Sequence, residues 1–299
     1  MRDSLGYVII FRLIYQRDKM ELQNIGIVGL GLMGGSLGLA LKKSLPWIKI
    51  YGLDHNTSHQ QEAISMGIVD TTVTTFEDLV ATCEVIVLCI PVNGIIDILQ
   101  QITSLPENIT LIDFGSTKEE ICQQTPQHLR HFLVAAHPMT GTEKHGPKAA
   151  LLDLYKNKTV VLCDLQASGA HQRKVAQYIL DTLEMNIIQM DASSHDKHAA
   201  FISHMPHAIS YALANSVMKQ EDAKSIVALA GGGFRDMSRI AKSSPSMWEA
   251  IFRQNKKNLI DAISSFQEEL QECKTMIENE EWEKLNDWMK QANKLHEIL

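Results

Sequence analysis

The 299 residues are enough for two domains with sizeable cores, and a content of 45% apolar and 21% charged residues is typical of a soluble protein. The net charge of -7 argues against nucleic acid or an anionic membrane surface as a partner. The five cysteines form no C-x-x-C pair, which favours reduced thiols and a cytoplasmic location.

Residues 1–20 form an extension to which the sequence assigns no role. The apolar stretch at residues 8–11 is followed directly by Arg12 and then by Arg17, and no small-residue cleavage site comes after it. The extension therefore predicts neither a membrane span nor a signal peptide.

A glycine-rich turn follows the first apolar segment of the main chain, residues 25–28. Gly29 permits a tight turn, Gly31 lets the backbone approach a pyrophosphate, and Gly34 lets the next helix pack closely on a sheet. The phosphates are then expected at the helix N-terminus, where N–H groups and the helix dipole favour negative charge. The residues expected to bind this part of a dinucleotide are Gly29, Gly31, Leu32, Met33 and Gly34.

Asp54 ends a second apolar run, residues 48–53, at the distance from the glycine turn that is typical of dinucleotide-binding domains. A carboxylate there can accept hydrogen bonds from both hydroxyls of the adenosine ribose. It would repel the 2′-phosphate of NADP, so the sequence predicts NAD as the cofactor.

Helical and strand patterns alternate between residues 57 and 190, which predicts a doubly wound parallel sheet of the Rossmann type over residues 21–190. Ligands of such a sheet bind beyond the carboxyl ends of its strands. Three polar loops leave strands at such ends: one begins at Pro91, one contains Ser116, and one contains His137, Thr142 and Glu143. The predicted strands after Asp54 are residues 85–90, 110–113, 132–136, 159–163 and 186–190.

His137 is the best candidate for the group that removes a proton from a hydroxyl during its oxidation. Histidine is suited to this task near neutral pH, and His137 follows directly on a predicted strand, beside the expected nicotinamide position. Four other histidines, at positions 195, 198, 204 and 207, have a spacing that could suggest a metal site. No H-E-x-x-H motif or cysteine accompanies them, and hydride transfer to a nicotinamide needs no metal. We therefore expect no metal, and assign these histidines to substrate contact or to helix packing.

Residues 191–299 lack strand patterns and predict a second, all-helical domain. Helices are expected at residues 195–218, with a kink at Pro206, and at 223–230, 245–254 and 255–277. Apolar residues at three- and four-residue spacing continue to residue 295, which fits either a homodimer interface or an internal core. Between these helices, a glycine run at residues 231–233 precedes Arg239, whose guanidinium could bind a carboxylate or simply be solvated.

Five segments occur in the order and spacing of the prephenate dehydrogenase family, which the chain resembles over about residues 22 to 275. In that family a Rossmann domain is joined to a helical dimerisation domain. The resemblance implies NAD-dependent oxidative decarboxylation of prephenate to 4-hydroxyphenylpyruvate, in tyrosine biosynthesis, by a homodimer. The segments are the glycine turn, residues 113–118, 137–143 and 203–207, and residues 231–239 followed by Trp248.

The resemblance also implies roles for individual residues. His137 resembles the catalytic histidine that accepts the hydrogen bond of the ring hydroxyl, and Ser116 resembles the serine that helps to orient both groups. Arg239 matches the arginine that holds a substrate carboxylate, and Trp248 resembles a residue offered to the partner subunit's site. The further substrate contacts that this resemblance predicts are His207, Thr142, Glu143, Asp236 and Gly233.

Three alternatives remain at this point. Arogenate, which has an amino group where prephenate has a keto group, could be the substrate, with tyrosine as the direct product. A beta-hydroxyacid dehydrogenase would share the layout but needs a catalytic lysine in the second domain, with no obvious counterpart at residues 195–218. A regulator that binds NAD without turnover would have no reason to combine Ser116, His137 and Arg239.

Overall fold

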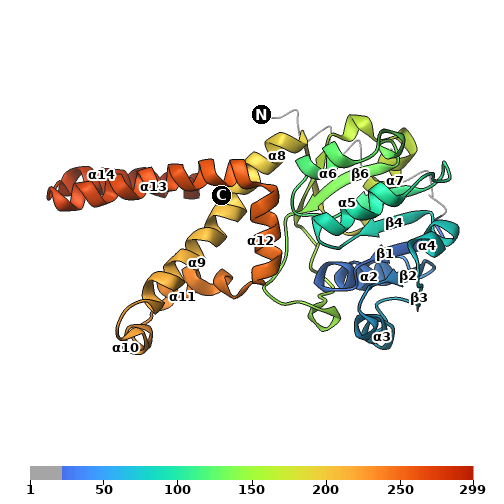
Figure 1. Ribbon diagram of the computed structural model, residues 1–299, viewed down its shortest axis with the longest axis horizontal. Helices are drawn as coiled ribbons and strands as arrows, with labels where there is room; N and C mark the ends of the chain where they lie inside the picture. Colours follow the sequence, from blue (N-terminus) through green and yellow to red (C-terminus); the bar gives the residue numbers. More distant parts are fainter. Residues whose placement is uncertain (1–21, 299) are drawn as a thin grey trace. The chain divides into compact units, whose positions relative to one another are not determined.

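The computed structural model describes residues 22–298, and its residues form two compact units (Figure 1). The sheet unit comprises residues up to His195 together with Ser243–Ala250, and the helical unit comprises Asp196–Lys242 and the residues from Ile251 onward. The extension at residues 1–20 lies outside the described residues. The sequence-based boundary after residue 190 stays a prediction, and it did not anticipate that Ser243–Ala250 would group with the sheet unit.

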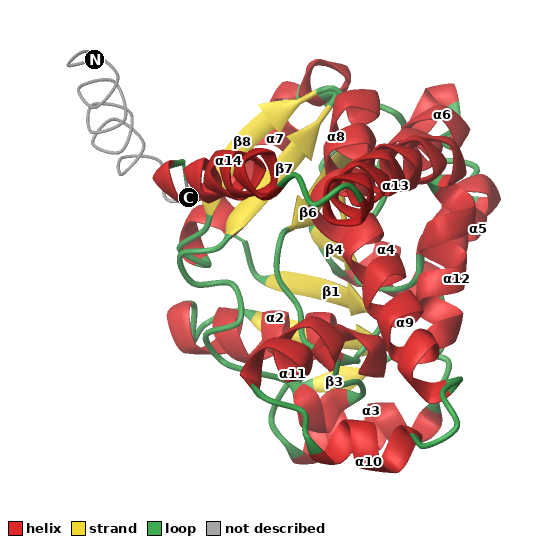
Figure 2. Cartoon of the chain, turned by 90° about the vertical axis from the view of Figure 1, so that its left-hand side faces the viewer, coloured by secondary structure: helices red, strands yellow, loops and turns green. Residues whose placement is uncertain are grey.

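The sheet unit contains an eight-stranded sheet with the order β3-β2-β1-β4-β5-β6-β7-β8. Its strands are drawn in yellow in Figure 2. All neighbouring strands are parallel except β6 and β7, which are antiparallel. The predicted Rossmann-type fold is confirmed, with this one reversed pair. The strands are β1 (Asn24–Val28), β2 (Lys49–Leu53), β3 (Thr71–Thr72), β4 (Val85–Leu88), β5 (Thr110–Asp113), β6 (Leu133–Pro138), β7 (Thr159–Cys163) and β8 (Asn186–Met190).

Helices cover both faces of this sheet, because its central strands are apolar on both sides. In β4, Val85 and Val87 belong to one buried cluster, whereas Ile86 and Leu88 belong to the other, as the alternation of strand side chains requires. The first cluster is closed by α2 (Leu32–Ser44), α3 (Thr57–Ser65) and α7 (Ala170–Thr182). The second is closed by α4 (Phe76–Thr82), α5 (Val92–Gln101) and α6 (Glu119–Gln124).

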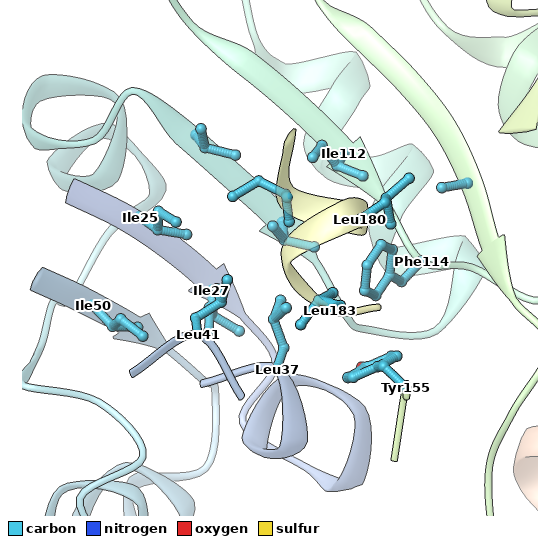
Figure 3. Packing of buried hydrophobic residues seen from close by; sticks show 14 of the residues in the cluster. Ile25, Ile27, Leu37, Leu41, Ile50, Ile112, Phe114, Tyr155, Leu180 and Leu183 are labelled. Atoms are coloured by element: carbon cyan, nitrogen blue, oxygen red, sulfur yellow. The ribbon is translucent and has the colours of Figure 1, made fainter. Parts of the chain in front are cut away.

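The first cluster extends from the half of the sheet that carries the glycine turn to the other half (Figure 3). Leu37 and Leu41 of α2 pack with Ile25 and Ile27 of β1, and Leu180 of α7 belongs to the same cluster. Because all five side chains are fully buried, each contributes roughly 1.5–3 kcal/mol through the removal of apolar surface from water. The glycine turn therefore stands on a rigid, well-packed base.

The helical unit contains α9 (Met205–Met218), α10 (Ala223–Ala228), α11 (Gly232–Ser238), α13 (Lys256–Glu278) and α14 (Trp282–Asn293). Two helices, α8 (Ala192–Ala199) and α12 (Pro245–Gln254), cross the boundaries between the units. A π-helical turn, Ala200–His204, ends two residues before Pro206, the position at which the sequence predicted a kink. Proline cannot donate to the carbonyl four residues earlier, which explains why the helix changes its hydrogen-bond pattern here.

The helices α13 and α14 form a hairpin, with the Trp288 indole Nε1–H donating to Glu269 Oε2 over 2.9 Å. Large apolar side chains on this hairpin are exposed, including Leu270, Ile277 and Trp282. Within residues 22–298, none of the helices combines the length and the apolarity that a membrane crossing would need.

Candidate active site

The carboxyl ends of four adjacent strands are aligned at one edge of the sheet. Val28 of β1 pairs in register with Leu88 of β4, Leu88 pairs with Asp113 of β5, and Asp113 pairs with Ala135 of β6. The segments that follow these residues carry the glycine turn, Pro91, Ser116 and His137. The structure thus brings the predicted cofactor turn and the Ser116 loop to one edge. His137 was predicted to follow a strand that ends at residue 136, but it lies within β6 and pairs with Val161 of β7.

The glycine turn between β1 and α2 has the geometry that the sequence predicted. Gly29 has a φ of 90°, and a Cβ at Gly34 would lie 1.9 Å from the Gly29 carbonyl oxygen. Both positions therefore exclude a side chain. Gly31 differs, because nothing lies within 4 Å of the position its Cβ would take. That open side leaves room for a phosphate against the backbone, at the start of α2.

Asp54 is held against this turn by two backbone donors. The Leu30 N–H donates to Oδ2 over 2.8 Å, and the Asn56 N–H donates to Oδ1 over 2.8 Å. The carboxylate is therefore fixed at the edge of the turn, yet its oxygens keep further lone pairs that could accept hydroxyl hydrogens. The imidazoles of His55 and His59 each approach Asp54 to 3.4 Å, a feature that the sequence analysis missed.

A buried ion pair joins the Ser116 loop to the strand that carries His137. Lys118 and Asp113 are both 0% exposed and contact each other directly, and the Lys118 ammonium also donates to the Ala136 carbonyl over 2.8 Å. The Gly115 N–H donates to Asp113 Oδ1 over 3.0 Å. Burial raises the pKa of Asp113 above the ordinary aspartate value, and the charge of Lys118 opposes that rise. Sequence reasoning quoted Lys118 in a motif but gave it no role.

His137 contacts a second histidine. Its Nδ1 lies 2.8 Å from His195 Nε2, and the two ring planes meet at 69°. His195 is only 2% exposed. The sequence analysis assigned His195 to substrate contact or helix packing and did not predict its contact with His137.

The segment after His137 returns to α2, the helix that follows the glycine turn. Tyr155, which is fully buried, donates its hydroxyl to the Met33 carbonyl over 2.7 Å, and the Leu151 N–H donates to Ser36 Oγ over 2.9 Å. The Phe114 ring lies 5.8 Å from the Tyr155 ring. These contacts connect the cofactor turn with both loops, and no sequence motif identified Tyr155 in advance. Thr142, which is exposed, and Glu143, which is half-buried, lie in this returning segment.

A second group of predicted residues lies in the helical unit. His207 Nδ1 is 2.9 Å from the Ser203 carbonyl, so this nitrogen carries the hydrogen and donates it. Burial lowers the pKa of His207, and the nearby charge of Arg239 lowers it further. His207 is therefore neutral near pH 7, close to a cation. Arg239 follows α11, which carries the exposed residues Gly233 and Asp236.

Trp248 differs from the other predicted substrate contacts. It lies on α12 within Ser243–Ala250, which groups with the sheet unit, and it is 6% exposed. Among the described residues, no group of three His, Cys, Asp or Glu side chains is arranged to hold a metal ion.

Family models of known proteins match almost the whole described chain. The prephenate dehydrogenase nucleotide-binding domain matches residues 37–189, and the prephenate dehydrogenase dimerization domain matches residues 191–291.

The chain belongs to the prephenate dehydrogenase family.

Individual members of the prephenate dehydrogenase family agree with this assignment. Prephenate dehydrogenase of Bacillus subtilis (strain 168) is 30% identical over 271 residues, which cover 89% of this chain and 73% of the relative. The structure of prephenate dehydrogenase from A. aeolicus in complex with hydroxyphenyl propionate and NAD+ has a TM-score of 0.87 and 32% identity, covering 94% and 100% of the two chains. Arogenate dehydrogenase of Synechocystis has a TM-score of 0.75 and 26% identity, covering 92% and 99%.

Proposed function

We propose that this family member catalyses the NAD-dependent oxidative decarboxylation of prephenate to 4-hydroxyphenylpyruvate. The observation that carries the proposal is the alignment of β1, β4, β5 and β6: the glycine turn follows β1, Ser116 follows β5, and His137 lies near the carboxyl end of β6. A hydride acceptor bound at the turn and a proton acceptor at His137 would meet at the same edge of the sheet. The NAD+ and hydroxyphenyl propionate in the A. aeolicus relative support this reading.

NAD, when bound, supplies the hydride acceptor. The residues that would hold it fit the group, since Gly31 leaves open space at the N-terminus of α2 and Asp54 has its carboxylate fixed beside the turn. Backbone N–H groups there favour a pyrophosphate, and a carboxylate favours ribose hydroxyls over a 2′-phosphate. The full set of proposed cofactor contacts is Gly29, Gly31, Leu32, Met33, Gly34, Asp54 and Pro91.

His137 takes up the proton of the ring hydroxyl as the hydride leaves the same carbon, and Ser116 orients both groups. The carbon–carbon bond to the ring carboxylate then breaks, its electron pair makes the ring aromatic, and carbon dioxide leaves. His137 returns the proton to the phenolate oxygen. Prephenate and NAD+ thus give hydroxyphenylpyruvate, carbon dioxide and NADH without net release of a proton, and aromatisation provides the driving force.

The substrate is a dianion, so at least one cationic partner is needed in its site. We assign Arg239 to a carboxylate, because a guanidinium forms two parallel hydrogen bonds with such a group. His207, kept neutral by burial and by Arg239, adds a polar contact without a second charge. The other proposed contacts are Thr142, Glu143, Asp236, Gly233 and, from the partner subunit, Trp248.

Arogenate is the second candidate substrate, because a relative from Synechocystis is named arogenate dehydrogenase. The two substrates share the ring hydroxyl and the ring carboxylate, on which the proposed chemistry depends. A beta-hydroxyacid dehydrogenase is not favoured, because both family models that match are those of prephenate dehydrogenases.

We further propose a homodimer, which the match to a dimerization domain supports. We also propose a cytoplasmic location, for which the cysteine pattern is the argument.

The test is NADH formation by the purified full chain with each of four pairs: prephenate or arogenate, combined with NAD or NADP. We expect the highest kcat/KM with prephenate and NAD. Higher activity with arogenate than with prephenate would make arogenate the proposed substrate. Equal kcat/KM with NADP and with NAD would contradict the role of Asp54. Absence of turnover in all four pairs would reject the proposed function.

A further inference from the structure

The catalytic proposal requires one particular arrangement of hydrogens on His137. The Nδ1 of this ring is 2.8 Å from His195 Nε2, a distance at which one nitrogen must donate and the other must accept. If His195 donates, the hydrogen on His137 is at Nε2, and that nitrogen cannot accept a proton. If His137 donates from Nδ1, its Nε2 has a lone pair available for the ring hydroxyl.

His195 is firmly placed against His137. Its backbone N–H donates to the Asp191 carbonyl in the first turn of α8, directly after β8. That turn is tied to the residue directly after β7, because the Ala192 N–H donates to Asp164 Oδ1 over 3.2 Å. At 2% exposure the His195 ring has little room to change rotamer. The position of its Nε2 relative to β6 is therefore set by packing.

We propose that His195 is a positioning residue that fixes the tautomer of His137, with His137 Nδ1–H donating to the lone pair of His195 Nε2. This inference rests on the proposed function. As His137 takes up the substrate proton it becomes a cation, and its Nδ1–H becomes a stronger donor. The hydrogen bond to His195 then stabilises the charged form more than the neutral form, which lowers the barrier.

The test uses the full-length chain and two substitutions that separate hydrogen bonding from packing. His195→Leu removes the acceptor, whereas His195→Gln retains a carbonyl oxygen that can accept from Nδ1–H. His171→Gln, at an exposed histidine of α7, is the matched control. Nitrogen-15 NMR of the ring nitrogens reports the tautomer of His137 directly, without any need for turnover.

We expect the wild-type chain and His195→Gln to show His137 protonated at Nδ1, and His195→Leu to lose this preference. Loss of an acceptor for a buried donor should lower kcat by roughly 5- to 100-fold in His195→Leu with little change in KM. His195→Gln should recover most of the rate, and His171→Gln should match the wild type. If His195 only filled space beside His137, His195→Leu and His195→Gln would not differ in this way in the His137 tautomer and in kcat.

Two results would overturn the inference: an unchanged His137 tautomer and kcat in His195→Leu, or loss of both in a correctly folded His195→Gln. If His195→Leu does not fold, the glutamine variant decides alone. Failure of the proposed function looks different, because neither prephenate nor arogenate would then be oxidised by the wild type. The NMR measurement would still report whether His195 sets the tautomer.

Discussion

His207 and Arg239 show how a neutral side chain can be maintained beside a cation. Burial is the larger cause of the lowered pKa of His207, and the charge of Arg239 is a further one. A neutral histidine is useful there, because two cations would attract a dianionic substrate but would also repel each other in its absence. Of these two side chains, only Arg239 therefore offers the substrate a positive charge.

Removal of the Arg239 charge should raise the pKa of His207. In Arg239→Gln the repulsion is lost while burial remains, so the pKa should move toward the ordinary histidine value of about 6.5 without reaching it. The measurement is an NMR titration of the His207 ring proton, with Arg235→Gln on the neighbouring α11 as control. An unchanged pKa in Arg239→Gln would show that the two side chains are too far apart to bind one ligand together.

Sequence reasoning at the level of single residues found positions that follow a strand, but not the partners of their side chains. Gly29, Asp54 and His137 were identified because strand ends and glycine spacing are properties of consecutive residues. The contact of His137 with His195 joins residues that are 58 positions apart. Such a contact depends on how β6, β7 and the start of α8 are placed in three dimensions, which the spacing of histidines in the sequence does not encode.

The ion pair of Asp113 and Lys118 links two elements at the predicted site. The buried ammonium contacts the carboxylate at the end of β5 and the carbonyl of Ala136 in β6, one residue before His137. Its attraction offsets the cost of burying both charges only while the two partners are present. The pair therefore connects the stability of the sheet edge with the geometry of the Ser116 loop.

We predict that Lys118→Met lowers the free energy of unfolding by about 3–5 kcal/mol, because it leaves the Asp113 carboxylate buried without its cation. The double variant Asp113→Asn with Lys118→Met should recover part of that loss. Denaturant titration is the measurement. Lys156→Met serves as control, since Lys156 forms an exposed pair with Glu184 at 3.0 Å, and such pairs contribute about 0–1 kcal/mol. Equal losses of unfolding free energy in Lys118→Met and Lys156→Met would contradict the stabilising role of the buried pair.

The order of elements was largely predictable, and the exceptions have physical causes. The two-residue strand β3 is too short to give a pattern of its own. The reversed strand β7 follows a segment, residues 139–158, that contains only a short 3-10 turn, Pro147–Ala149, in place of a crossover helix. Antiparallel pairing needs no such helix, so the chain can return beside β6 in the opposite direction.

The exposed apolar side chains of the α13–α14 hairpin bear on how the whole molecule assembles. Leu270 and Trp282 are each 57% exposed, and Ile277 is 48% exposed. Leu270 and Ile277 are seven residues apart and lie on one face of α13. Their exposure, together with the match to a dimerization domain, favours the homodimer over the purely internal core that the sequence left open.

The wild-type chain should be a dimer by light scattering at micromolar concentration. Leu270→Lys combined with Ile277→Lys should shift it toward monomer, because two charges would then be buried in the contact. Glu272→Lys, at an exposed position of the same helix, is the control and should leave the dimer intact. A monomeric wild type would reject the proposed homodimer.

The central claim of this account is that His137 accepts the proton of the substrate hydroxyl during oxidation. The measurement that tests it is the steady-state kcat of His137→Asn with NAD and the preferred substrate, together with the Kd for NAD. Asparagine can form hydrogen bonds but cannot take the proton, so kcat should fall by about 10²- to 10⁴-fold while NAD binding is nearly unchanged. Wild-type kcat in this variant would contradict the account and direct attention to another acceptor, of which His207 is the first to examine.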